Sequence, residues 1–196
     1  LWKNSIHVLG KDIVRFHAVY WPAFLMAANL NIPHTVYAHG WWTNEGQKIS
    51  KSLGNTIDPI KLIEEFNLDY VRYFLMTEMP FGNDGNFSRE AFINKVNSNL
   101  CNNIGNLAQR VLSFINKNCG AKIPTFNLQE VDNKLLESAY SLADKMRTHI
   151  DKQEIHFAYE EVISLGSAAN EYVDKQAPWV LKKSDPERMN TVLYTL

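Results

Sequence analysis

The sequence predicts a mixed fold in which a short α/β segment precedes an all-α helix bundle. Between residues 5 and 40, two apolar runs flank one helical pattern, and this order is typical of a right-handed strand–helix–strand crossover in an open α/β sheet. From Ser88 onward, apolar residues recur at spacings of three and four, which is the period of amphipathic helices. No alternation typical of strands interrupts that second region.

Composition and charge exclude several classes of protein. The 196 residues suffice for one large or two small domains, and 45% hydrophobic with 21% charged residues is ordinary for a soluble globular chain. No apolar run is long enough to span a membrane, and a formal net charge of −1 creates no general field for nucleic acid. The two cysteines form no Cys-x-x-Cys pair, so we expect no metal site in this chain. Because the first residues resemble neither a signal peptide nor a natural initiator, we expect the interior of a longer protein.

The α/β segment begins with a buried, parallel strand over residues 5–9, which ends at Gly10. Asp12 is expected to cap the following helix, and Pro22 within the helical pattern predicts a kink or a break. A second strand is expected over residues 35–40. Ligands of such sheets bind at the carboxyl ends of the strands, so we expect the residues that follow each strand to lie near a ligand.

The stretch Lys48-Ile49-Ser50-Lys51-Ser52, between Gly46 and Gly54, suits a polyphosphate ligand. A lysine ammonium is a compact charge on a flexible stem that can follow a moving phosphate, and the serines add hydroxyl donors. If pyrophosphate leaves during a reaction, fixed cations aimed at the growing negative charge lower the barrier by ~3–4 kcal/mol per strong contact. On these five residues alone, a solvated surface loop is the simpler alternative.

Two short helices and a loop are expected to connect this stretch to the bundle. Asp58 and Pro59 form a helix start, and Asp69 is expected to cap the next helix. Residues 80–86 form a loop that marks a candidate domain boundary. The sequence thus predicts three regions, namely the end of the α/β domain with the lysine-rich stretch (1–57), a helical connection (58–87) and the helix bundle (88–196).

The bundle is expected to contain one long amphipathic helix and several shorter ones. The long helix covers residues 88–120, and further helical patterns cover residues 132–151 and 154–174. Another helix is expected to begin near Pro178 or Pro186. Basic and acidic residues are equal in number in this region, which is unlike a nonspecific nucleic-acid binder.

Three separated stretches together resemble the methionyl-tRNA synthetases, a family of class I aminoacyl-tRNA synthetases. The lysine-rich stretch is similar to the KMSKS signature of that class, with Ile49 in place of the usual Met. The other stretches are Gly10-Lys11-Asp12-Ile13-Val14-Arg15-Phe16-His17 with Tyr20-Trp21-Pro22, and, in the bundle, Asn106-Leu107-Ala108-Gln109-Arg110 with Tyr172-Val173-Asp174-Lys175-Gln176-Ala177-Pro178-Trp179. The resemblance implies the C-terminal part of a Rossmann-type α/β catalytic domain followed by an all-α anticodon-binding domain. The family's HIGH-type ATP motif and connective insertion would precede this chain.

The resemblance also implies a methionine–tRNA ligase, which uses ATP with Mg²⁺ to form methionyl-adenylate and then methionyl-tRNA. Lys51, with Lys48 beside it, is implied to stabilise the phosphates of ATP as the carboxylate of methionine attacks. Asp12 suits ribose hydroxyls, although serving only as a helix cap is the alternative. The implied ATP-binding residues are Gly10, Lys11, Asp12, His39, Ser50, Lys51 and Ser52, of which His39 is placed by position alone.

Phe16 and His17 are implied to line the pocket for the methionine side chain, with Trp21 packed beneath it. A thioether is soft and polarizable, so aromatic surroundings suit it. By spacing alone both residues have a structural alternative, because Phe16 lies on the apolar stripe and a single His on a helix is commonly a satisfied core residue.

The implied anticodon-binding residues are Asn106, Arg110, Pro178 and Trp179. Asn106 and Arg110 are four residues apart and share one helix face, where they can hydrogen bond to a base or a phosphate. A Trp face stacks on an unstacked base with ~1–3 kcal/mol, and a single-stranded anticodon loop is RNA of the kind that proteins read in this way. On sequence alone, a buried core position for Trp179 is an equal alternative.

The implied partners are the methionine tRNA with its CAU anticodon, methionine and ATP, with no membrane. The expected location is cytoplasmic, with an organellar matrix as the alternative. Two other functions stay open. One is another class I synthetase, for valine, leucine, isoleucine or cysteine, and the other is an isolated tRNA-binding fragment with no catalysis of its own. Anticodon-loop binding, measured separately from ATP turnover, distinguishes them.

Overall fold

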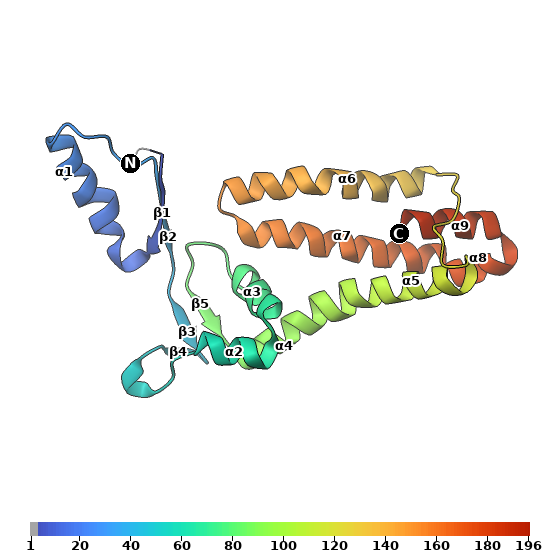
Figure 1. Cartoon of the computed structure of the whole chain (residues 1–196), viewed down its shortest axis with the longest axis horizontal. Coiled ribbons are helices and arrows are strands. Elements are labelled where there is room, and N and C mark those ends of the chain that lie inside the picture. The colour runs from blue at the N-terminus through green and yellow to red at the C-terminus, as the bar shows by residue number, and fades with distance from the viewer. Residues whose placement is uncertain (1–3) are drawn as a thin grey trace. The chain divides into compact units, whose positions relative to one another are not determined.

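The computed structural model describes residues 4–196, which divide into two compact units with the boundary between Phe92 and Ile93 (Figure 1). The first unit is α/β and the second is helical, so the predicted fold class is confirmed. Each unit has its own buried apolar side chains, and each is therefore described by itself.

The first unit opens with a parallel pair of strands. β1 (Ile6–Gly10) pairs with β2 (Thr35–His39), in a register that places Gly10 opposite His39. The crossover between them consists of a 3₁₀ turn (Lys11–Ile13), a π-helical turn (Phe16–Tyr20) and α1 (Trp21–Ala27). The parallel pairing brings the carboxyl ends of both strands to the same edge, as the sequence predicts.

The start of the crossover helix differs from the prediction. Gly10, in extended conformation, occupies the N-cap position, and no side chain caps the 3₁₀ turn. The prediction that Asp12 caps this helix is therefore wrong, because Asp12 lies inside the first turn. The irregularity expected at Pro22 is present as the π-helical turn that leads into α1, since proline has no N–H with which to continue the regular ladder.

A second sheet of three short strands follows, which the sequence does not predict. β3 (Trp42–Asn44) pairs antiparallel with β4 (Gln47–Lys48) and parallel with β5 (Gly85–Phe87). The lysine-rich stretch thus begins in a strand, and the end of the predicted 80–86 loop joins the sheet. Strands of two or three residues carry too few alternations to be recognised from their pattern.

Two helices, α2 (Pro59–Phe66) and α3 (Leu68–Thr77), follow the lysine-rich stretch. Asp58 caps α2 as predicted, because its side chain accepts the N–H of Ile60 at 3.0 Å. The cap of α3 is Asn67, which accepts the N–H of Asp69 at 3.0 Å, so the prediction of Asp69 as the cap is wrong. A single residue, Asn67, separates the helices, and its φ of 79° with ψ of 145° is a conformation that residues with a side chain rarely adopt.

An aromatic cluster forms the core beneath the second sheet. Phe74 and Phe92 are almost completely buried, and their ring centroids lie 5.1 Å apart. Phe87 of β5 packs edge-to-face on Phe74 at 5.8 Å, and Phe66 of α2 lies 4.5 Å from Phe92. The packing of these rings holds β5, and the loop that precedes it, against α2 and α3.

The helical unit confirms the predicted helices. Its elements are α4 (Arg89–Lys95), which begins in the first unit, a π-helical segment (Val96–Gly105), α5 (Asn106–Asn118), α6 (Glu130–Asp151), α7 (Ile155–Gln176), α8 (Pro178–Ser184) and α9 (Pro186–Thr195). The first three elements are continuous and form the long helix that the apolar period predicts. Figure 1 shows α6 and α7 as an antiparallel hairpin, with α8 and α9 folded at the end of α7. Both Pro178 and Pro186 begin a helix, which is a favourable position for proline.

A buried ionic network joins three helices of this unit. The fully buried carboxylate of Asp132 accepts hydrogen bonds from two nitrogens of Arg188, at 2.5 and 2.7 Å, and from the hydroxyl of Tyr172 at 2.5 Å. The N–H of Gln129 adds a fourth bond at 2.8 Å. Burial disfavours the charged form, but the bonds from Arg188, Tyr172 and Gln129 outweigh it and keep the pKa of Asp132 below its ordinary value.

The network gives the helical unit a predicted sensitivity to alkali. Burial, and then the hydrogen bond to Asp132, raise the pKa of Tyr172 from 10.0 to about 12. Between these values the unfolded chain loses the tyrosine proton while the folded chain keeps it, so stability falls as pH rises through this range, by about 2–3 kcal/mol in total. Urea unfolding followed by circular dichroism at successive pH values measures this loss. The loss should be absent in Tyr172→Phe and intact in Tyr140→Phe, whose ring is 75% exposed, and equal loss in both variants contradicts the prediction.

Candidate functional site

A cavity of about 450 Å³ lies near the carboxyl ends of β1 and β2. It is lined by Asp12, Trp41, Trp42, Thr43, Lys48, Ile49 and Asp84. Two residues expected at a nucleotide, Asp12 and Lys48, therefore line one cavity although they are far apart in the chain. Gly10 and His39 are paired across the strands just before it, and His39 Nδ1 lies 2.9 Å from the carbonyl oxygen of Gly40.

Lys11 makes an ion pair beside this cavity that the sequence does not predict. Its Nζ lies 2.6 and 2.7 Å from the two carboxylate oxygens of Asp84 and 4.4 Å from the centroid of the Trp41 ring. The backbone N–H of Trp41 also donates to Asp84, at 2.8 Å. The hydrogen bonds from Lys11 and Trp41 lower the pKa of Asp84, so this carboxylate is charged at neutral pH and compensates the charge of Lys11.

Gly40 allows the loop that carries Asp84 to approach. A Cβ atom added at Gly40 would lie 2.0 Å from the carbonyl oxygen of Asn83, so any other residue would displace this loop. Asp84 and Trp41 are functional candidates that the sequence misses. No spacing rule connects Lys11 with a residue 73 positions away, and only the glycine at position 40 hints at a close approach.

The lysine-rich stretch is held by the side chain of Asn55. This amide accepts the N–H of Ser50 at 2.8 Å and donates to the carbonyl of Lys48 at 3.0 Å. Lys51 follows in a short 3₁₀ turn (Lys51–Leu53), which ends at Gly54 with φ of 65°. Asn55 thus fixes the backbone on both sides of Ile49, a role that the sequence does not reveal.

The two lysines of this stretch lie in different surroundings. Lys48 lines the cavity, whereas Lys51 and the two serines are not part of its wall. The hydroxyls of Ser50 and Ser52 lie 2.7 Å apart and bond to each other. Within residues 4–196 neither Lys48 nor Lys51 has an acidic partner, so both ammonium groups are available to an anionic ligand.

A second cavity, of about 700 Å³, is aromatic and lies along the crossover helix. His7, Phe16, His17, Tyr20, Trp21 and Phe24 line it. The predicted pair Phe16 and His17 is therefore brought together, and Trp21 is part of the wall. His17 is oriented by a 3.1 Å contact between its Nδ1 and the carbonyl oxygen of Ile13. His7 is a further lining residue that its position in a strand does not reveal, and its buried Nε2 has no partner among the described residues.

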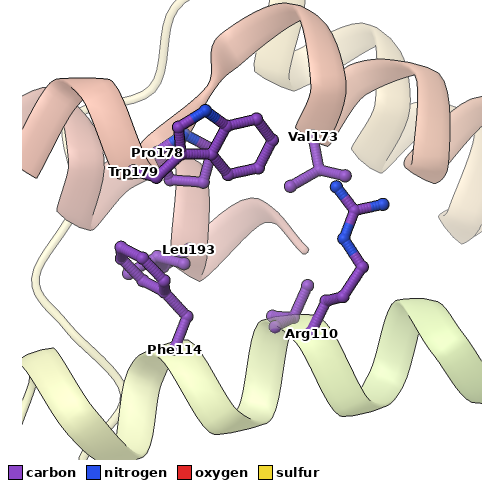
Figure 2. A pocket seen from close by; sticks show the side chains of 7 residues that line it. Arg110, Phe114, Val173, Pro178, Trp179 and Leu193 are labelled. Carbon is purple, nitrogen blue, oxygen red and sulfur yellow. The ribbon is translucent and has the colours of Figure 1, made fainter.

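The helical unit has a smaller cavity, of about 170 Å³, between α5, α7, α8 and α9. Figure 2 shows its lining residues, which are Arg110, Val111, Phe114, Val173, Pro178, Trp179 and Leu193. The guanidinium carbon of Arg110 lies 5.6 Å from the ring centroid of Trp179, and Arg110 also donates to Asp174 at 2.6 Å. The arrangement combines an aromatic face, a cation and an apolar floor, and these are the components of a site for an unstacked base.

The structure excludes a fully buried position for Trp179. Its side chain is 46% exposed at the rim of the cavity, so it is not a buried core anchor. Trp179 lies in the first turn of α8 rather than in an irregular segment, and only Ala177, with φ of 46°, is irregular. Pro178 is buried in the cavity wall, whereas Asn106 is exposed one turn before Arg110 and does not line the cavity.

Two kinds of feature are absent from the described residues. Within residues 4–196, no three His, Cys, Asp or Glu side chains are grouped so that they could hold a metal ion. No helix in the same range combines the length and the apolar character that crossing a membrane requires.

Comparison with known families divides the chain in the same order as the two units. The family described as tRNA synthetases class I (M) matches residues 1–112, and the anticodon binding domain of methionyl tRNA ligase matches residues 124–195. Among curated proteins, the methionine–tRNA ligase of Rickettsia felis is 55% identical over the whole chain, and that of Brucella suis is 50% identical over 98% of it. The chain spans 39% and 38% of the length of these relatives.

Solved structures agree with this comparison. The Mycobacterium tuberculosis methionyl-tRNA synthetase in complex with methionyl-adenylate superposes on 99% of the chain with a TM-score of 0.91 and 45% identity. The apo form of the same enzyme gives a TM-score of 0.86 and 43% identity. The chain covers 39% and 38% of these structures.

Proposed function

Because the chain belongs to the methionyl-tRNA synthetase family, we propose that it takes part in the ATP-dependent attachment of methionine to its tRNA through methionyl-adenylate. The cavity that joins Asp12 and Lys48 at the carboxyl ends of two parallel strands carries the catalytic part of this proposal. The exposed indole of Trp179 beside Arg110 carries the RNA-binding part.

The proposed reaction requires cations near the phosphates of ATP. A carboxylate oxygen of methionine attacks the α-phosphorus, the bond to the bridging oxygen breaks, and pyrophosphate leaves with the electron pair. Lys48 lines the cavity and Lys51 is unpaired three residues further, so both can follow the growing charge on the leaving group. Asp12 would accept hydrogen bonds from ribose hydroxyls. The remaining proposed nucleotide contacts are Gly10, His39, Ser50 and Ser52.

We assign Lys11 a structural role beside the nucleotide, although its position in the sequence suggests direct contact with the phosphates. Its ammonium is already paired with both oxygens of Asp84, so it offers less net charge to a nucleotide than Lys48 or Lys51. We place it at the nucleotide as the residue that holds Asp84 and Trp41 in the cavity wall. Mg²⁺ is commonly held by substrate phosphates and one or two carboxylates, so it would enter together with ATP.

The aromatic cavity suits the side chain of methionine. Phe16 and His17 offer ring surfaces to a polarizable thioether, and Trp21 and His7 lie edge-to-face with ring centroids 5.0 Å apart beside them. A methionine bound here would have its carboxylate free to face the nucleotide. This cavity supports methionine as the amino acid in preference to valine, leucine, isoleucine or cysteine.

The proposed RNA partner is the anticodon loop of methionine tRNA, with the sequence CAU. Trp179 would stack on one unstacked base, Arg110 would pair with a base edge or a phosphate, and Pro178 would form the floor. Asn106, exposed one helical turn from Arg110, would contact a neighbouring nucleotide. We also propose a cytoplasmic location, with an organellar matrix as the alternative.

Replacement of Trp179 tests the RNA-binding part. Trp179→Ala removes a stacking surface of ~1–3 kcal/mol, so we expect the dissociation constant for a CAU anticodon stem-loop to rise roughly tenfold to a hundredfold. Fluorescence anisotropy of a labelled stem-loop at fixed salt measures this. Tyr140→Ala is the matched control, because Tyr140 is a 75% exposed aromatic residue of the same unit outside the cavity. An unchanged dissociation constant in Trp179→Ala, or an equal loss in both variants, contradicts the assignment.

RNA binding without catalysis is the second candidate function. The observation that favours it is that the chain spans 39% of the length of the Rickettsia felis relative, so most of that enzyme's length has no counterpart in this chain. Methionine-dependent exchange of pyrophosphate into ATP, measured on the same preparation as stem-loop binding, separates the two. Binding without exchange supports the second candidate for the isolated chain.

A further inference from the structure

The buried network of Asp132 extends to the last residue of α7. One nitrogen of Arg188, Nη2, donates both to Asp132 at 2.7 Å and to the side-chain oxygen of Gln176 at 2.7 Å. Gln176 ends α7, and Trp179 follows three residues later. Among the described residues, the side chain of Gln176 makes one hydrogen bond, and its partner is Arg188.

The turn between Gln176 and Trp179 is strained and needs support. Ala177 has φ of 46° and ψ of 62°, a left-handed conformation that is unfavourable for a residue with a side chain. Such conformations persist where surrounding contacts fix them. Ala177 donates its N–H to Val173 at 2.9 Å and accepts the N–H of Val180 at 2.8 Å. The side chain of Gln176 adds a hydrogen bond to Arg188 that links the start of this turn to α9.

The same helices supply the walls of the cavity beside Trp179. Val173 follows Tyr172 of the network directly in α7, and Leu193 follows Arg188 in α9 after little more than one turn. The network therefore fixes α7 against α9, and with them the distance between Val173 and Leu193. Gln176 itself does not line the cavity, so any effect it has on RNA passes through other residues.

We propose that Gln176 is a positioning residue, which couples the buried Asp132–Arg188 pair to the orientation of Trp179 and so to anticodon recognition. The inference rests on the proposed function of the cavity in the helical unit. It adds that selectivity for the anticodon depends on a hydrogen bond that never touches the RNA. Without that bond the Ala177 turn is free to relax, and the indole loses its fixed place opposite Arg110.

The test uses two substitutions of different chemistry in the 196-residue chain. Gln176→Met keeps the length of the side chain and removes the acceptor, whereas Gln176→Glu keeps an acceptor for Arg188. Gln153→Met is the matched control, because Gln153 lies in the turn just before α7 and its side chain has no hydrogen-bond partner among the described residues. None of the three substitutions changes Asp132 or Arg188, so we expect the bonds between these two residues to stay intact.

Three readouts separate positioning from general stability. The first is the indole N–H resonance of Trp179 in a ¹⁵N correlation spectrum, assigned by its loss in Trp179→Phe. The second is the dissociation constant for the CAU stem-loop and for a loop with one anticodon base changed. The third is the thermal midpoint. We expect Gln176→Met to shift the indole resonance and to weaken CAU binding roughly tenfold, with a smaller loss for the altered loop and a midpoint close to wild type. Gln176→Glu should restore both signals.

The contrary results are equally defined. The inference fails if Gln176→Met leaves the indole resonance and the CAU affinity unchanged, or if Gln153→Met has the same effect. It also fails if the affinity lost in Gln176→Met returns on cooling to a temperature at which both proteins are fully folded. If the wild-type chain does not bind the CAU loop, the proposed function fails, while the indole resonance alone still decides whether Gln176 positions Trp179.

Discussion

In a protein that carries this chain together with the rest of a catalytic domain, Lys51→Ala slows the formation of methionyl-adenylate by ~10²–10³-fold, with little change in methionine affinity. Lys51 has no acidic partner among the described residues, and the stretch around it is held by Asn55. Its charge is therefore not used in an ion pair of the fold and is available to the ligand that we propose. The expected loss is in the rate constant, because negative charge on the departing pyrophosphate is greatest in the transition state.

Single-turnover kinetics with ATP and methionine measure this step directly. Lys61→Ala is the control, because Lys61 is an exposed lysine of α2 that also has no acidic partner in the described part of the chain. It should keep the wild-type rate. A near-normal rate in Lys51→Ala, or a rise in the methionine Michaelis constant as the main effect, would remove Lys51 from the proposed catalytic site.

Asp132→Ala is expected to destabilise the helical unit by about 3–5 kcal/mol, because it leaves the buried guanidinium of Arg188 without its charged partner. Asp132 is 0% exposed and Arg188 is 9% exposed, so water cannot replace the lost bonds easily. Tyr172 and the N–H of Gln129 lose an acceptor at the same time. Urea unfolding followed by circular dichroism gives the difference in unfolding free energy.

A surface ion pair of the same helix provides the control. Asp144 pairs with Arg147 at 2.8 Å, but their side chains are 85% and 74% exposed. Asp144→Ala should therefore change stability by less than about 1 kcal/mol. If the two variants lose similar stability, the Asp132–Arg188 pair does not have the structural importance that its burial indicates.

Helices and strands were predictable where the apolar pattern covers many residues, and they were missed where it covers only two or three. The apolar repeat from residue 88 to 120 covers many turns, so the long helix emerged from the sequence even though residues 96–105 are π-helical. The strands β3, β4 and β5 have two or three residues each and left no readable alternation. Asp69 and Asn67 are both residue types that favour an N-cap position. Asn67 is the cap of α3 because it is the single residue between the two helices.

In the candidate site too, residues could be placed where local spacing determines their position, whereas contacts between residues far apart in the chain could not be predicted. Asn106 and Arg110 could be placed on one helix face because their spacing fixes it, and Gly10 and His39 could be placed together because both end parallel strands. No local rule joins Lys11 to Asp84, 73 residues away, or Asp132 to Arg188, 56 residues away. These contacts exist only after the chain has folded, so their partners are invisible to spacing and periodicity.

Stem-loop binding tests most directly whether the helical unit reads a methionine anticodon. The 196-residue chain is titrated with a CAU anticodon stem-loop and with a loop in which one anticodon base is changed, at the same moderate salt concentration. The proposed site predicts that the altered loop binds roughly tenfold or more weakly, as the loss of one base contact of ~1–3 kcal/mol requires. Equal affinity for the two loops would show that the cavity of Arg110 and Trp179 does not read the anticodon, and would contradict the account.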